Sequence, residues 1–226
     1  MCEDYRGERK ENFRYMNDGN KKNRAMTITY VVDGGLYINI TNRCTNRCDF
    51  CIRNNGDGAY GSESLWLERE PTEEEILDSL NGYTLSDFSE IVFCGYGEPA
   101  MRLSVARSVA LRIKEKHPDM KIRINTNGQS DLILGADSAP LYKDAFDEVS
   151  ISLNASNSKR YQEICHSVYG AESFNAILRF ASNVVKYVKV VKFSVVRESL
   201  TEEELVECQR ISDECNVMLR IRDLIS

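Results

Sequence analysis

Three closely spaced cysteines are the part of this sequence best suited to chemistry. Cys44, Cys48 and Cys51 lie in the stretch NITNRCTNRCDFC, with three residues between the first two and two between the last two. Thiols at this spacing in one loop can converge on a metal. A structural zinc site closes with four Cys or His ligands, and neither His117 nor His166 has ligand spacing to the triplet. An iron–sulfur cluster fits better, because three Cys ligands leave one iron open to bind another molecule.

The triplet also supports a family resemblance. With the aromatic Phe50 before its third cysteine, it resembles the signature of the radical S-adenosylmethionine (SAM) superfamily. The segment GYGEP at 95–99 is similar to that family's G-x-G-E-P segment. NITNRCTNRCDFCIRN, INTNGQ and SISLNA together look most like a small group of radical SAM proteins named for their association with TatD-family nucleases. The resemblance covers residues 36–222, and the group's name reveals no substrate.

The resemblance implies a cofactor pair and a reaction. Cys44, Cys48 and Cys51 would bind one 4Fe–4S cluster, and the amino and carboxylate groups of SAM would chelate its fourth iron. The reduced cluster would cleave SAM to methionine and a 5'-deoxyadenosyl radical, which abstracts hydrogen from an unidentified substrate. This anaerobic reaction needs an external one-electron donor such as flavodoxin or ferredoxin. The alternative is an iron–sulfur sensing or electron-transfer module that does not cleave SAM.

The same resemblance suggests SAM contacts in GYGEP. It implies that Glu98 holds the amino group of SAM, in a turn where Gly95, Tyr96 and Gly97 let the backbone come close. A strand-ending turn that happens to contain Glu-Pro is the alternative. Phe50 would pack near the adenine, or would only shield the cluster from water.

Polar residues alternate with apolar ones in two predicted strands. A parallel sheet covered by helices on both faces is apolar on both, so a polar face suggests a cavity that holds a ligand. A face exposed to water is the alternative. These side chains can offer hydrogen bonds to the ribose and carboxylate of SAM, although each can equally bond the local backbone. They are Asn125, Asn127, Ser150, Ser152 and Asn154. Ser194, Val196 and Arg197 end a third predicted strand and are expected to line the same cavity.

Strand-like and helix-like segments must position these residues, and they alternate along the chain. This order predicts an α/β fold with a parallel sheet and right-handed crossovers. The radical SAM resemblance implies that this sheet forms a partial (βα)6 TIM-like barrel. Capping-box patterns at Thr72 and Thr201 mark two helix starts. The predicted strands are 36–41, 90–94, 121–126, 148–154, 188–196 and 217–222. The predicted helices are 72–81, 101–116, 139–145, 157–165, 172–187 and 202–215.

Composition limits the remaining possibilities. The chain has 226 residues, 42% of them hydrophobic, which suits one domain. Its net charge of -6 argues against nucleic acid as the partner. No apolar run could span a membrane, so we expect a cytoplasmic protein. Residues 1–25 are polar and predict a mobile extension before a single domain at 26–226. The substrate, a small molecule or a partner protein, is left open. The cysteines expected to be in the core or without a ligand role are Cys2, Cys94, Cys165, Cys208 and Cys215.

Overall fold

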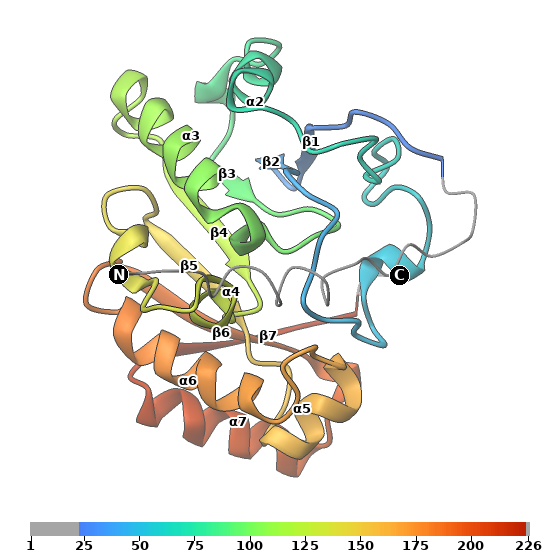
Figure 1. The fold of residues 1–226 in the computed structure, drawn as a ribbon, viewed down its shortest axis with the longest axis vertical. Coiled ribbons are helices and arrows are strands. Elements are labelled where there is room, and N and C mark those ends of the chain that lie inside the picture. The colour runs from blue at the N-terminus through green and yellow to red at the C-terminus, as the bar shows by residue number, and fades with distance from the viewer. Residues whose placement is uncertain (1–22, 225–226) are drawn as a thin grey trace, which may run out of the picture.

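A computed structural model describes residues 23–224, which form one curved sheet with helices along its outer side (Figure 1). The strands follow one another across the sheet in chain order. They are β1 (Thr29–Val32), β2 (Gly35–Ile38), β3 (Glu90–Phe93), β4 (Ile122–Thr126), β5 (Glu148–Ser152), β6 (Val190–Val196) and β7 (Met218–Arg222). The α-helices are α2 (Glu73–Leu80), α3 (Leu103–Lys116), α4 (Ser130–Leu134), α5 (Ser158–Cys165), α6 (Glu172–Val184) and α7 (Glu202–Glu214). The 3-10 helices are η1 (Ile52–Asn54), η2 (Leu85–Asp87), η3 (Pro99–Arg102), η4 (Ala139–Tyr142) and η5 (Arg197–Ser199).

Strands β2 to β7 pair in parallel, which confirms the predicted α/β fold with its six parallel strands. The prediction missed β1, which pairs antiparallel with β2. The turn between them is formed by Asp33 and Gly34, whose φ angles are 46° and 77°. Positive φ at both turn residues is the hairpin geometry that Asp-Gly favours, so the sequence did carry a signal for β1.

The two predicted capping boxes are present. In α2, the Thr72 hydroxyl accepts a hydrogen bond from the Glu75 amide at 3.2 Å, and the Glu75 carboxylate accepts one from the Thr72 amide at 2.8 Å. Thr201 and Glu204 make the same pair of bonds at the start of α7. Each box satisfies two backbone donors that a helix start would otherwise leave free.

The main apolar core lies between the sheet and its helices. Alternate residues of each strand point into it, as Ile91 and Phe93 do in β3, where both are fully buried. Helix α6 contributes an apolar stripe to it, with Phe174, Ile177 and Ala181 buried. The other alternate residues of the strands face the inner side of the sheet, and that face carries most of the polar residues that the sequence singled out.

One helix was placed wrongly. The predicted helix at 139–145 is only the 3-10 turn η4, because Lys143 has extended backbone with ψ of 137° and stops it. Helix α4 was not predicted. It ends at Gly135, whose φ of 71° is the left-handed conformation typical of a helix C-terminus.

The predicted extension at 1–25 lies outside the described residues except for its last three. Within those three, Ala25 donates its amide to the Trp66 carbonyl at 2.9 Å and forms a bridge to Leu67. Contact with the domain therefore begins before Met26. No helix within 23–224 is long and apolar enough to cross a membrane.

Candidate cofactor site

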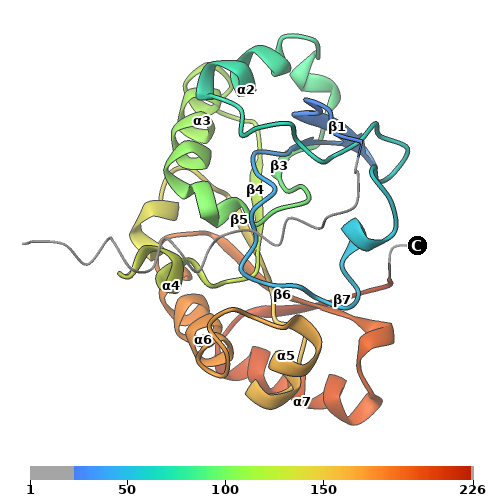
Figure 2. The ribbon, with the colours of Figure 1, turned by 45° about the vertical axis from the view of Figure 1, so that its right-hand side comes forward.

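The three cysteines lie in the connection between β2 and α2, which crosses the carboxyl end of the sheet and reaches α5 (Figure 2). Two backbone hydrogen bonds fix the loop there. Arg47 donates its amide to the Cys165 carbonyl at 2.9 Å, and Asp49 donates its amide to the Ile164 carbonyl at 3.0 Å. The cysteine loop is thus attached to the last turn of a helix more than a hundred residues later in the chain.

All three thiols are partly shielded from water. Burial raises the pKa of the Cys44 thiol to about 12 and also raises the pKa of Cys51. Contact with Cys165, together with burial, raises the pKa of Cys48. The Arg53 guanidinium acts in the opposite direction on each of the three. A free thiolate is therefore disfavoured in this loop, and a bound cation would be needed to hold the thiols in their ligand form.

The donor set fits an iron–sulfur cluster, although the side chains are not converged. Over residues 23–224 no three His, Cys, Asp or Glu side chains are already arranged to hold a metal. Cys48 nevertheless lies within electrostatic range of both Cys44 and Cys51. The fit rests on three thiols in one anchored loop with the Arg53 guanidinium near them.

A buried polar network fixes the residues between the first two cysteines. Gln129 is at its centre, fully buried. Its amide nitrogen donates to the Asn46 side-chain oxygen and to the Tyr161 hydroxyl, both at 2.9 Å. Its amide oxygen accepts from the hydroxyls of Thr45 at 2.8 Å and Ser167 at 3.1 Å. This network joins the cysteine loop to the segment after β4 and to α5.

Asn127 connects the same network to the cluster loop. Its side-chain nitrogen donates to the Thr45 hydroxyl at 2.8 Å and lies 4.0 Å from the Cys44 sulfur. Its side-chain oxygen accepts a hydrogen bond from the backbone N–H of Gln129 at 3.1 Å. Sequence reasoning proposed Asn127 but missed Thr45, Asn46, Gln129 and Tyr161. The only signal was the polar run TNGQ directly after a strand.

The glycines of GYGEP are required by close backbone packing. A Cβ at Gly97 would overlap the Thr41 carbonyl oxygen and lie 2.7 Å from that of Arg43. A Cβ at Gly95 would overlap the Asn39 side chain. These glycines bring the end of β3 against the start of the cysteine loop, so their first role is to let two segments of the chain meet.

Glu98 is buried and already has three hydrogen-bond donors. One carboxylate oxygen accepts from the Ala100 amide at 2.9 Å and from the Thr126 hydroxyl at 2.7 Å. The other accepts from the Asn127 amide at 2.6 Å. Burial raises the pKa of Glu98, and these bonds act in the opposite direction. Glu98 therefore joins the turn after β3 to the end of β4, and its contact with the amino group of SAM stays a prediction.

Four further predicted residues gather at the carboxyl ends of β5 and β6. Ser152 pairs in register with Ser194, and Val196 ends β6 beside them. Asn154 has a φ of 57° and is buried, with its side-chain nitrogen 3.8 Å from the Cys165 sulfur. Its side-chain oxygen is buried and has no hydrogen-bond partner among the described residues. A buried acceptor of this kind fits a site that a ligand completes.

Other predicted residues lie apart from this group. Tyr96 packs edge-on against Trp66 at 5.1 Å and donates its hydroxyl to the Gly56 carbonyl. Asn125 accepts a hydrogen bond from Arg123 at 2.9 Å. Ser150 is buried on the inner face, two residues nearer than Ser152 to the amino end of β5. Phe50 is half-buried against the main core, and Arg197 is exposed.

The other cysteines divide as their positions suggest. Cys208 lies in the apolar core, as predicted. Cys94 and Cys215 are partly buried. Cys165 is fully buried, but its contact with Cys48 was not foreseen. Cys2 lies outside the described residues.

A hollow of about 600 Å³ is found elsewhere, between α2 and the end of α3. Its lining includes Leu77, Arg112 and His117 and none of the cysteine-loop residues. We assign it no part in the site, because no residue that the motifs single out lines it.

Comparison with known proteins bears on the family of the chain. Residues 38–210 match the sequence model of the Radical SAM superfamily. A probable GTP 3',8-cyclase from Thermococcus kodakarensis is 25% identical over 190 residues, which cover 84% of this chain and 56% of that protein. The chain thus spans little more than half the length of that curated relative.

Solved structures show the same fold. A radical SAM methyltransferase from Sphaerobacter thermophilus matches with a TM-score of 0.60 and 15% identity, covering 85% of this chain and 57% of that one. Streptococcus suis SuiB bound to S-adenosylmethionine matches with a TM-score of 0.52 and 17% identity, covering 84% and 38%. SuiB bound to its precursor peptide SuiA matches with a TM-score of 0.58 and 15% identity, covering 84% and 39%.

The family model covers most of the chain, and the fold is the partial barrel expected of it. The narrower resemblance to the TatD-nuclease-associated group stays a prediction. On the matched residues and the cysteine loop together, this chain belongs to the Radical SAM superfamily, whose members use a 4Fe–4S cluster and S-adenosylmethionine.

Proposed function

We propose that this chain is a radical SAM enzyme that initiates a reaction by reductive cleavage of SAM. The observation that carries the proposal is the anchored cysteine loop. Cys44, Cys48 and Cys51 are held at the carboxyl end of the sheet by Gln129 and its partners, next to the turn that contains Glu98. This edge is where ligands bind in parallel sheets and barrels.

The chain's own residues would bind and orient the two cofactors. The three cysteines would ligate the cluster, with Arg53 favouring their thiolate form. Asn127 would orient Cys44 from 4.0 Å. Glu98 would offer its remaining lone pair to the amino group of SAM, and Asn154 its unpartnered oxygen to the ribose. When bound, the cluster and SAM supply methionine and a 5'-deoxyadenosyl radical that takes hydrogen from a substrate.

The substrate is proposed only as a class, either a small molecule or a partner protein. The Thermococcus relative is named a GTP 3',8-cyclase, and SuiB was solved with a peptide. Each supports one of the two classes. We further propose an external one-electron donor such as flavodoxin or ferredoxin, and a cytoplasmic location, where a reducing environment keeps the cysteines free.

The test is anaerobic reconstitution of the full chain with iron and sulfide, followed by reduction in the presence of SAM. We expect methionine and 5'-deoxyadenosine, measured by mass spectrometry. A Cys48→Ala variant should form neither product. Cys208→Ala is the matched control, because Cys208 is in the core away from the loop, and this variant should keep SAM cleavage.

The same experiment separates the alternatives. A cluster that forms in the wild-type chain but yields no 5'-deoxyadenosine above the Cys48→Ala level would favour a sensing or electron-transfer module. Stoichiometric zinc without iron in anaerobically purified protein would refute the cluster itself.

A further inference from the structure

The pairing of β6 with β7 places two arginines on the inner face of the sheet. Arg220 pairs in register with Ser194, and Arg222 pairs with Val196. Ser194 in turn pairs with Ser152. Residues in register in a parallel sheet point to the same side. Arg220 and Arg222 therefore share the face and the carboxyl-end position of the candidate cofactor site.

Arg222 lies beside the cysteine loop. Its charge acts on the thiols of Cys48 and Cys51, and on Cys94 and Tyr60 across the inner face. In Figures 1 and 2 the end of β7 runs close to η1, which directly follows Cys51. The strand that closes the sheet thus delivers a cation to the edge of the proposed cluster site.

The guanidinium of Arg222 has no acidic partner among residues 23–224. No hydrogen bond or ion pair joins it to any residue from 23 to 224, and the charged neighbour that acts on it is Arg220, of like sign. Burial lowers the pKa of Arg222. Two carboxylates near this strand end, Asp223 next to Arg222 in the chain and Glu198 just after β6, are engaged elsewhere. Asp223 lies 4.0 Å from Arg197, and Glu198 accepts the Leu224 amide at 2.8 Å.

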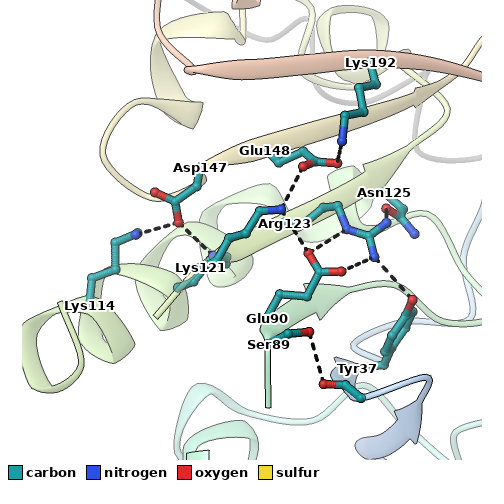
Figure 3. Close-up of polar contacts among 12 residues, drawn as sticks. Tyr37, Ser89, Glu90, Lys114, Lys121, Arg123, Asn125, Asp147, Glu148 and Lys192 are labelled. Carbon is teal, nitrogen blue, oxygen red and sulfur yellow. Dashed lines mark hydrogen bonds and ion pairs between the residues drawn. The ribbon is translucent and has the colours of Figure 1, made fainter. Parts of the chain in front are cut away.

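Two other cations on the inner face, Arg123 and Lys192, do have acidic partners (Figure 3). Arg123 bonds both carboxylate oxygens of Glu90, at 2.7 and 3.2 Å. Lys192 donates to Glu148 at 2.9 Å. The fold therefore supplies an acidic partner to the inward cations nearer the amino ends of the strands, but not to Arg222.

We propose that Arg222, assisted by Arg220, binds the carboxylate or phosphate of an anionic small-molecule substrate beside the cysteine loop. A half-buried cation without a partner costs stability, and an anionic ligand removes that cost on binding. The guanidinium fork suits carboxylate and phosphate because it donates two parallel hydrogen bonds. This inference rests on the proposed function and narrows its substrate to an anion.

The test titrates the reconstituted full-length chain with pyrophosphate and, separately, with SAM, by anaerobic calorimetry. Arg222→Gln should weaken pyrophosphate binding about tenfold, the effect of one lost charge-assisted contact. SAM binding should change less than about twofold on the same scale. Arg210→Gln on the outer helix α7 is the matched loss of charge and should leave both affinities unchanged.

Three outcomes would overturn the proposal: no pyrophosphate binding to the wild-type chain, equal pyrophosphate affinity in Arg222→Gln, or a parallel loss of SAM affinity. The last would mean that Arg222 holds the carboxylate of SAM. Circular dichroism checks that Arg222→Gln is folded. If it is not, Arg222→Lys, which keeps the charge but loses the guanidinium fork, should show the loss of pyrophosphate affinity instead. Failure of the proposed function would show instead as absent 5'-deoxyadenosine in the wild-type chain.

Discussion

The two ends of the inner sheet face carry charged residues in different ways. At the amino ends of the strands, Arg123 is matched by Glu90, and Lys192 by Glu148 (Figure 3). At the carboxyl ends, the carboxylate of Glu98 is held by uncharged donors, and Arg222 has no acidic partner within residues 23–224. Within the described residues, these amino-end cations have acidic partners, and the carboxyl-end cation Arg222 does not.

This difference separates stability from function within one sheet. Paired charges at the amino ends close the inner face without needing a ligand. At the carboxyl ends, buried polar groups position the cysteine loop. Among residues 23–224, the Asn154 oxygen has no hydrogen-bond donor and the half-buried Arg222 has no acidic partner. A ligand bound at the carboxyl ends would give both groups a partner. Four substitutions would break or sharpen this contrast.

The largest expected effect is on the amino-end pairs. Arg123→Met should lower the free energy of unfolding by about 4 kcal/mol, because Glu90 would keep a buried charge without its main partner. Denaturant unfolding of the apo chain measures this. Arg69→Met removes an exposed partner of Glu75 and should change stability little. A similar loss of unfolding free energy in both variants would contradict the distinction between ion pairs on the inner face and exposed ion pairs.

The next effect concerns the approach of the GYGEP turn to the cysteine loop. Gly97→Ala should cost about 3 kcal/mol of stability, since its Cβ would overlap the Thr41 carbonyl and force the backbone apart. It should also reduce the iron retained after reconstitution. Gly82→Ala is the control, because its Cβ would have no neighbour nearer than Ser79 O at 4.0 Å. Normal iron content in Gly97→Ala would show that this close approach is dispensable.

A smaller loss is expected from the buried amide network. Gln129→Leu should cost about 2 kcal/mol, because Asn46 and the hydroxyls around it lose their shared partner. Since the network positions the cysteine loop, the rate of cluster reconstitution should fall more than the overall stability. The exposed Gln209, which bonds Asp213 on α7, gives the matched Gln209→Leu control. Equal rates of cluster reconstitution in Gln129→Leu and Gln209→Leu would show that the Gln129 network does not position the cysteine loop.

The smallest effect is a pH dependence from the amino-end pairs. Burial acts to raise the pKa of Glu148, but Lys192 and Lys121 outweigh it and hold that pKa below its ordinary value. A depressed folded-state pKa gives stability above the unfolded pKa, about 4.3, and that stability is lost as the pH falls through the folded value. Between about pH 6 and pH 3, wild-type unfolding free energy should fall more steeply than that of Glu148→Gln. Parallel curves would contradict this linkage.

Much of the fold could be predicted because it depends on local patterns. Alternating strand and helix periodicity gave the six parallel strands in order, and the threonines at 72 and 201 gave two helix starts. The errors arose where local signals were weak or short. Helix α4 is only five residues long, and β1 depends on pairing with β2 through a two-residue turn.

The candidate site was only partly predictable. The cysteine spacing and GYGEP are contiguous motifs, so the sequence alone pointed to the cluster and its family. Thr45, Asn46, Gln129 and Tyr161 form one network, in which the directly bonded Asn46 and Tyr161 lie 115 residues apart. No single segment reveals that their hydrogen-bonding groups meet.

By itself, then, the sequence indicated the family and its cofactors, because three thiols within eight positions and the GYGEP segment are contiguous motifs. Tertiary structure alone decided which charges are matched. Arg123 and Arg222 have the same side chain on the same face of the sheet. Arg123 meets a carboxylate, whereas Arg222 meets none in the part of the chain that the structure describes. The physical reason is that the energy of a buried charge depends on what other strands place beside it, which no local pattern records.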